Sequence, residues 1–235
     1  MKQINHVWGL IAAACIVCGH CLAWTVFRRR QPKVAVFSRE TDNQSVHKYF
    51  MKLALEQAMQ AGRRNEVPIG AIVVRNITTN IDVSSHQYFQ VLAAGRNEIE
   101  TKWDASAHAE LVALRQAAQQ IKNWRLLNCT LYSTLEPCPM CLSACQAFRL
   151  SRLVYGAPDL RLGAVETYTR LLDLPHPFHN VSVEEIGVLG QNCSDIMRSF
   201  FRERRRQPRT TERKRGLFLR FKDIWSRLLQ RWNIS

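Results

Sequence analysis

Hydrophobic positions along the middle of the chain follow two alternating patterns. Apolar residues from Val46 to Ala61 recur at helical spacing, and Gly62 stands where such a helix would end. Short, continuously apolar runs follow at 69–74 and 91–95. Runs of this length indicate buried strands rather than helices. The chain therefore opens its folded part with a helix and a pair of antiparallel strands.

The connection between these strands, residues 75–90, is polar and too long for a tight hairpin, so it is a candidate contact segment. Beyond it the pattern becomes helical again at 107–121, with Ser106 as the expected N-cap. A third strand at 130–134 and a helix at 139–150 follow.

A fourth strand at 152–156, a weaker strand at 181–186 and a helix at 194–206 complete the pattern. Strands that alternate with helices of this length are typical of α/β proteins. We therefore predict a three-layer α/β/α sandwich around a mixed, five-stranded sheet.

The two ends of the chain carry its whole net charge of +14. Residues 1–40 hold six lysines and arginines against one acid, and residues 202–235 hold twelve against three. The middle, residues 41–201, holds fifteen of each. The high pI therefore does not indicate a basic catalytic domain.

The N-terminal 40 residues have the composition of a targeting presequence or a membrane anchor. Residues 7–27 are largely apolar, with His20 as the only strongly polar side chain, and small residues before Trp24 suit a signal-peptide cut. Residues 28–39 are basic and acid-free, which is typical of transit peptides. Together they are similar to the bipartite presequences of algae with complex plastids. We expect import into a plastid rather than a mitochondrion; a retained membrane anchor, a cytoplasmic protein and a wrong gene model are the alternatives.

The C-terminal end divides into a basic linker, 207–216, and a basic amphipathic helix, 217–235, with Trp225 and Trp232 on its apolar side. Such a helix suits a membrane surface, a partner helix or packing on its own domain. The arginines from 202 to 215 are a candidate phosphate-binding segment, and a solvated linker is the alternative.

Of eight cysteines, five lie beyond the apolar N-terminus, and two of these, Cys138 and Cys141, form a Cys-x-x-Cys pair. An odd number with one close pair favours metal chemistry in a reducing compartment over disulfides. His108 would complete the three protein ligands of a catalytic zinc, with Glu110 beside the open fourth position. Residues two apart in a helix point away from each other, so His108 and Glu110 converge only at a helix start.

Simpler interpretations of these residues remain open. The cysteines alone suit a redox pair. Cys145, one turn beyond Cys141, would convert the site into a closed structural zinc centre. A solvated His108 unrelated to the cysteines is the third interpretation.

The motifs His108-Ala-Glu110 and Pro137-Cys-Pro-Met-Cys141 together resemble the signature of the cytidine deaminase-like superfamily. Within it the chain is most similar to tRNA-specific adenosine deaminases. The similarity extends over about 45–206 and includes Val67-Pro-Ile-Gly-Ala71, the run from Trp124 to Pro137, Tyr155-Gly-Ala157 and Ser199-Phe-Phe-Arg202. The resemblance assigns residues 41–206 to a CMP/dCMP-type deaminase domain of cytidine deaminase-like fold.

The resemblance also implies roles for individual residues. It implies one Zn²⁺ per subunit, held by His108, Cys138 and Cys141, with Glu110 transferring protons as the catalytic residue. It further implies that Asn97 contacts the purine and that Asp159 and Arg161 lie near the flipped nucleotide. The simpler alternatives are that Asn97 stabilises a turn and that Arg161 is an ordinary solvated charge. Asn97, Asp159 and Arg161 are therefore the candidates for substrate contact.

The family pattern is not kept throughout. Leu142-Ser-Ala-Cys145 stands where family members usually carry smaller residues, which affects packing near the zinc or at the subunit interface. Family members form homodimers, so we expect a homodimer by analogy.

The expected function is zinc-dependent hydrolytic deamination of adenosine to inosine at wobble position 34 of tRNA. A small-molecule deaminase acting on guanine or cytosine compounds is the second candidate, and it would not need Asn97 and Asp159 in these places. A noncatalytic RNA-binding subunit with structural zinc is the third, and the presence of Glu110 disfavours it.

Overall fold

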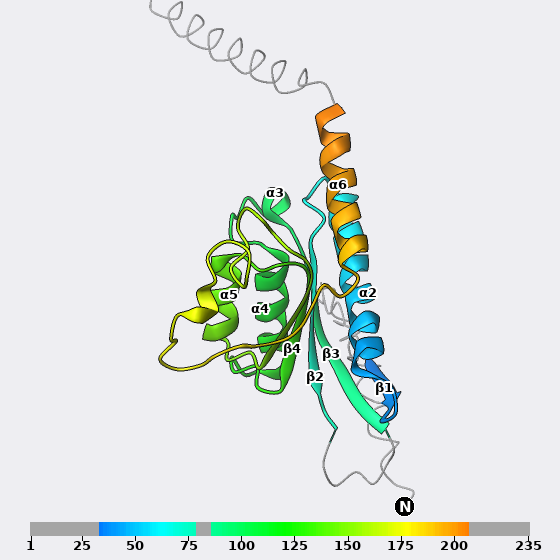
Figure 1. The fold of residues 1–235 in the computed structure, drawn as a ribbon, viewed down its shortest axis with the longest axis vertical. Helices are drawn as coiled ribbons and strands as arrows, with labels where there is room; N and C mark the ends of the chain where they lie inside the picture. The colour runs from blue at the N-terminus through cyan, green and yellow to red at the C-terminus, as the bar shows by residue number, and fades with distance from the viewer. Residues whose placement is uncertain (1–32, 79–85, 207–235) are drawn as a thin grey trace, which may run out of the picture. The chain divides into compact units, whose positions relative to one another are not determined.

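The computed structural model describes residues 33–78 and 86–206. Its centre is a mixed six-stranded sheet in the order β1-β3-β2-β4-β5-β6, where the sequence predicts five strands (Figure 1). β1, β3, β2 and β4 pair antiparallel, whereas β4, β5 and β6 run parallel. The strands are Val34–Ser38 (β1), Gly70–Asn76 (β2), His86–Arg96 (β3), Cys129–Leu135 (β4), Arg152–Ala157 (β5) and Ser182–Ile186 (β6).

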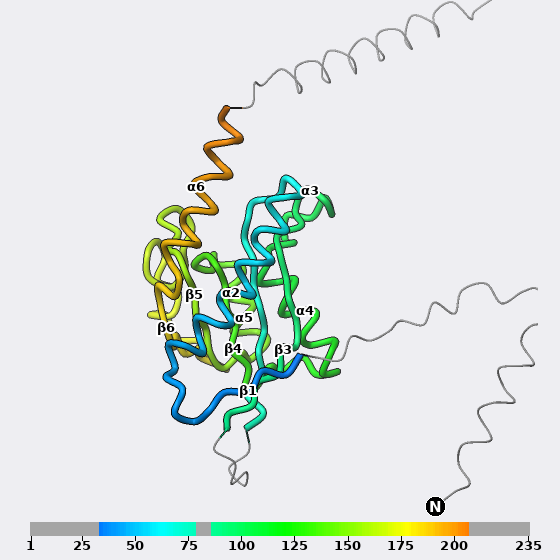
Figure 2. The backbone as a smooth tube through the Cα atoms, turned by 90° about the vertical axis from the view of Figure 1, so that its right-hand side faces the viewer, coloured from blue at the N-terminus to red at the C-terminus, as the bar shows by residue number. Residues whose placement is uncertain are grey.

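Helices cover both faces of the sheet, which confirms the predicted three-layer sandwich. α4 and α5 lie on one face, and α2 and α6 lie on the other (Figures 1 and 2). The helices are Asn43–Gly62 (α2), Ile99–Lys102 (α3), Ala109–Ile121 (α4), Pro139–Ala147 (α5) and Gly190–Arg206 (α6), and Leu171–Asp173 forms a short 3-10 turn.

Side chains of the central strands alternate between the two layers, as a period of two requires. In β2, Ala71 and Val73 pack against α4, whereas Ile72 and Val74 pack against α2. Leu131 and Tyr132 of β4 divide in the same way. The continuous apolar runs of the sequence are therefore strands that are buried on both faces.

Strand β1 is the sixth strand, and it lies in the segment that the sequence assigns to the presequence. It pairs with residues 86–90 of β3, from Val34 opposite Gln90 to Ser38 opposite His86. Phe37 makes edge-to-face contacts with Tyr49, Phe50 and Phe89, at centroid distances of 5.4–6.0 Å. The folded part of the chain therefore begins upstream of residue 41.

The carboxyl ends of the parallel strands β4 and β5 lie next to each other. Leu135 at the end of β4 pairs with Ala157 at the end of β5. Glu136 to Cys141 follow the first strand and Asp159 follows the second. The topology therefore brings the Cys-x-x-Cys pair and the Asp159 segment to one edge, where α/β sheets commonly bind ligands.

Several sequence predictions lie outside the described residues. These are the apolar and basic presequence up to residue 32, the centre of the 75–90 connection at 79–85, the linker 207–216 and the helix 217–235. Within residues 33–78 and 86–206, no helix is long and apolar enough to cross a bilayer.

Candidate active site

Two helix starts meet at the candidate site. His108 is the N-cap of α4 and Cys138 is the N-cap of α5, both with extended backbone and with Pro139 as the first residue of α5. At this position the N-cap side chain projects from the helix end rather than along its side. The predicted convergence of His108, Cys138 and Cys141 at two helix starts is thus observed.

The three side chains form a cluster compatible with zinc. The Nδ1 atom of His108 lies 3.7 Å from Sγ of Cys138 and 3.6 Å from Sγ of Cys141, and all three ligand atoms lie within 4.8 Å of one another. Ligands at about 2.0–2.3 Å around one tetrahedral Zn²⁺ have such mutual separations. One nitrogen and two sulfurs leave a fourth position for water.

The start of α4 is held by Asn97 rather than by Ser106. Ser106 donates its backbone N–H and its hydroxyl to Asp104 Oδ1, so its side chain is engaged before the helix begins. Asn97, the residue directly after β3, accepts the backbone N–H of Ala109 through Oδ1 at 3.2 Å. The predicted cap is therefore wrong, and the cap comes from a residue distant in sequence.

Glu110 lies inside the protein beside the ligand cluster. Its side chain is buried, with 4% exposed, and Oε1 accepts a hydrogen bond of 3.4 Å from the Ser133 hydroxyl. Oε2 has no hydrogen-bond partner among the described residues. Burial raises the pKa of this carboxyl, because the charged form loses water. A buried carboxyl with one unused oxygen is suited to accepting and returning a proton.

The ligand side chains already differ in proton affinity. The Cys141 thiol donates to Cys138, which lowers the pKa of Cys138 to about 4 and raises the pKa of Cys141. The hydrogen bond with Cys138 raises the pKa of His108. Since a metal binds thiolates and neutral imidazole, its binding would release protons from this cluster.

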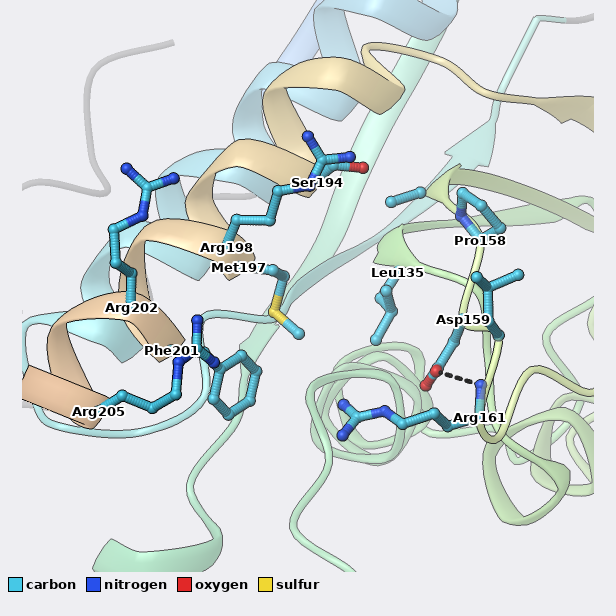
Figure 3. Close-up of a pocket in the computed structure, with 12 residues that line it drawn as sticks. Leu135, Pro158, Asp159, Arg161, Ser194, Met197, Arg198, Phe201, Arg202 and Arg205 are labelled. Atoms are coloured by element: carbon cyan, nitrogen blue, oxygen red, sulfur yellow. Dashed lines mark hydrogen bonds between the residues drawn. The ribbon is translucent and has the colours of Figure 1, made fainter.

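A cleft of about 610 Å³ lies between the end of β5 and helix α6, on the other face of the sheet from α4 and α5 (Figure 3). Asp159 and Arg161 line one side of it, and Asp159 Oδ1 accepts the backbone N–H of Arg161. The guanidinium of Arg161 lies 6.0 Å from the ring centroid of Phe201 in α6. Arg198, Arg202 and Arg205 of α6 also line the cleft, so it is locally positive although residues 41–201 are neutral overall.

The family model of the MafB19-like deaminases matches residues 45–205. The tRNA-specific adenosine deaminase of Haemophilus influenzae is 38% identical over 157 residues, which cover 67% of this chain and 84% of that protein. The chain belongs to the tRNA-specific adenosine deaminase family. The predicted family membership is thereby confirmed, over nearly the predicted range.

Two further comparisons support placement among these deaminases. A solved structure from a study of A-to-I editing by tRNA:A34 deaminases at the wobble position has 38% identity and a TM-score of 0.55, and it covers 63% of this chain and 98% of that chain. The chloroplastic tRNA(adenine(34)) deaminase of Arabidopsis thaliana is 35% identical over 180 residues. These residues cover 70% of this chain but 13% of the Arabidopsis protein.

The closed, four-ligand interpretation of the deaminase site finds no support in the geometry. Cys145, on the buried face of α5, belongs to the core cluster shared with α4, and burial raises the pKa of its thiol. Among the described residues, the cluster of metal-ligating atoms comprises His108, Cys138 and Cys141 without it. Cys145 thus takes part in packing rather than in the ligand cluster.

Two buried glutamates, Glu66 and Glu136, were not predicted from the sequence. Glu66 accepts the backbone N–H groups of Glu100 and Thr101, at 3.3 and 2.7 Å. Glu136 accepts bonds from the segment 159–167. In both residues burial acts to raise the pKa, but the hydrogen bonds outweigh it and lower the pKa overall. For Glu136 the sequence does contain a signal, because an acidic residue there directly follows an apolar strand.

Proposed function

We propose that this chain catalyses hydrolytic deamination of adenosine to inosine at wobble position 34 of tRNA. The observation that carries the proposal is a complete ligand set, His108, Cys138 and Cys141, beside a buried Glu110 whose Oε2 is unpartnered among the described residues. The proposal is supported by alignment with tRNA-specific adenosine deaminases over most of their length.

One Zn²⁺ per subunit would be held by Nδ1 of His108 and the two thiolates. When bound, zinc lowers the pKa of a water molecule and so supplies a nucleophile at neutral pH. Glu110 would take up a proton from the attacking water at Oε2 and deliver it to the departing amino group. One water is consumed and one ammonia leaves, while the carboxyl of Glu110 ends the cycle in its starting state.

Asn97 is assigned to the adenine. Because its oxygen accepts the Ala109 N–H, its amide nitrogen is the group that remains to donate to a base. N7 of adenine is an acceptor that suits this donor. The same side chain would thus fix the start of α4 and orient the substrate.

Asp159 and Arg161 are assigned to the nucleotides that flank the flipped adenosine. They lie in the segment that follows β5, next to the segment that leads to Cys138. The arginines of α6 would bind phosphates on the far side of the cleft, and basic residues up to 215 would extend this surface.

We further propose a homodimer and a plastid location. Family resemblance supports the dimer, and exposed apolar side chains at Leu160, Leu162 and Tyr168 would be covered by a partner. The chloroplastic relative and the basic, acid-free segment 28–39 support import into a plastid.

The function is tested with the full chain and a tRNA transcript that carries adenosine at position 34. Inosine at that position, detected by mass spectrometry of the digested product, is the expected result. A transcript with guanosine at position 34 is the matched substrate control. Free adenosine, guanine and cytidine are assayed in parallel, and product from free bases or nucleosides alone would instead favour a small-molecule deaminase.

A further inference from the structure

Glu136 is an acidic side chain in an unusual place. It follows the last residue of β4, precedes Cys138 by two residues and is 1% exposed. No ion pair of Glu136 with a basic side chain occurs within the described part of the chain. A buried carboxylate without a counter-charge is costly unless hydrogen bonds satisfy it, so its donors identify what it holds.

All donors to Glu136 come from the segment that follows β5. Oε1 accepts three backbone N–H groups, from Val165, Glu166 and Thr167, at 2.8–3.1 Å. Oε2 accepts the N–H of Asp159 at 3.0 Å and lies 2.7 Å from Oγ1 of Thr167. One carboxylate thus binds both ends of the segment 159–167.

The segment closes tightly around this carboxylate. A Cβ atom added to Gly163 would overlap the Glu136 carboxylate and Oγ1 of Thr167, so a larger residue there would displace these two groups. The next residue, Ala164, donates its N–H to the carbonyl of Pro137 at 2.9 Å. The segment 159–167 is therefore bound by Glu136 and Pro137, the two residues that directly precede Cys138.

We infer that Glu136 is a positioning residue that holds Asp159 in place relative to the zinc ligands. It acts through the backbone of Asp159 and touches neither the metal nor the substrate. The consequence for catalysis rests on the proposed function, since Asp159 matters only if tRNA is bound there. The contacts that hold Asp159 to Glu136 do not depend on the proposed function.

Glutamine is the informative substitution at this position. In Glu136→Gln the amide oxygen can still accept the three N–H groups that now reach Oε1. The amide nitrogen then faces the N–H of Asp159, and two donors repel each other. Oγ1 of Thr167 can still accept a hydrogen bond from this amide nitrogen. The hydrogen bond from the backbone N–H of Asp159 is therefore the one that is lost.

The kinetic test uses the full chain and the adenosine-34 tRNA. Glu136→Gln should raise KM about tenfold, which corresponds to about 1.4 kcal/mol, while kcat stays within about twofold and bound zinc is unchanged. Thr167→Val, which leaves Glu136 in place, should raise KM about threefold. Tyr132→Phe is the matched control, because it removes another buried hydrogen bond, to His47 at 3.0 Å, on the α2 face of the sheet. It should leave KM unchanged.

A double-mutant cycle tests whether Glu136 acts through Asp159. Once Asp159→Ala is present, adding Glu136→Gln should change kcat/KM little, since the positioned group is gone. Full additivity, or equal losses of kcat and zinc in Glu136→Gln, would overturn the inference.

Amide hydrogen exchange provides a readout that needs no activity. In Glu136→Gln the Asp159 amide should exchange at least about tenfold faster than in the unmodified chain, whereas Tyr132→Phe should not change it. Unchanged exchange would also overturn the inference. If the unmodified chain makes no inosine, the proposed function fails, and exchange still decides whether Glu136 holds the segment.

Discussion

At the scale of single residues, the site contains a buried carboxyl that lowers the stability of the folded state when it is charged. Glu110 is buried and its Oε2 lacks a partner among the described residues, so charging it costs folding free energy. A carboxyl whose pKa is raised in the folded state destabilises that state at any pH above its unfolded value. Such a cost is common where catalysis needs a proton acceptor.

Replacing this carboxyl should separate activity from stability. Glu110→Gln keeps the shape but removes the proton acceptor, so kcat should fall about 10³-fold or more. In zinc-free protein near pH 7 the same change should raise the melting temperature, because the neutral amide avoids the cost of a buried charge. Glu56→Gln, on the exposed face of α2, is the control and should change neither. A kcat close to that of the unmodified chain would show that Glu110 is not the proton carrier.

Zinc affinity should depend on pH in a defined direction. Binding must remove the proton of Cys141, whose pKa is raised, and below the raised pKa of His108 it must remove a second one. The apparent association constant should therefore increase about tenfold per pH unit near neutrality and more steeply at acidic pH. Competition with a chelator of known proton affinity measures it. A pH-independent constant would contradict this assignment of protons.

Local spacing made the cluster predictable, because His108, Cys138 and Cys141 lie at helix starts that the sequence marks. Glu110 follows from the same argument. The cap of α4 was not predictable, since Asn97 reaches Ala109 only after β3 has packed beside that helix. Glu136 likewise acquires its donors from a segment more than twenty residues further along the chain.

At the scale of elements, two glycines permit helices to lie directly on strands. A Cβ atom at Gly95 in β3 would collide with the backbone of Ala109 and Ala113 in α4. At Gly70 in β2 it would collide with the backbone of α2 on the opposite face. The first contact lies beside the start of α4, which carries His108, and the second lies away from it.

This pair gives a matched test of how α4 sets the site. Gly95→Ala and Gly70→Ala should each lower the free energy of unfolding by about 1–3 kcal/mol, because α4 or α2 must move outward. Gly95→Ala should in addition weaken zinc binding by displacing Ala109 and His108. Urea denaturation and chelator competition provide the two measurements. Equal zinc affinity in both variants would show that the site tolerates movement of α4.

Most elements were predictable, since strands buried on both faces leave apolar runs such as 69–74. β1 was missed for a physical reason. Its partner is the start of β3, residues 86–90, which alone reads as part of a polar connection. Neither five-residue segment indicates a strand by itself; the pairing and the contacts of Phe37 with α2 and β3 stabilise both.

At the scale of the whole molecule, the net positive charge lies outside the central part of the chain, and most of it follows residue 201. Arginines of α6 line the cleft, and the basic sequence continues to residue 215. Phosphate contacts release counterions, so each contributes to the salt dependence of binding. On the proposed function, affinity for RNA and chemistry at the candidate zinc site would therefore be separable.

Deletion of residues 207–235 should flatten the salt dependence of tRNA binding and leave kcat at saturating tRNA unchanged. Arg202→Ala should reduce the slope of log Kd against log salt by about 1, as one phosphate contact would. Titrations at several salt concentrations measure both. An unchanged slope after the deletion would show that residues 207–235 make no phosphate contacts with tRNA.

The N-terminal boundary can be tested by stability. Removing residues 1–31 should leave the melting temperature unchanged, since β1 stays intact. Removing residues 1–40 deletes β1 and Phe37, and should lower it by several degrees. Equal melting temperatures would mean that β1 adds nothing to the fold.

β1 also constrains how a presequence can be processed. A protease that cut downstream of Val34 would remove the strand that covers the edge of β3. The exposed N–H and C=O groups of that edge would then template pairing between molecules. A five-residue strand thus sets the innermost permissible cleavage point, and an inaccurate cut would yield an enzyme prone to aggregate rather than one that is merely shorter.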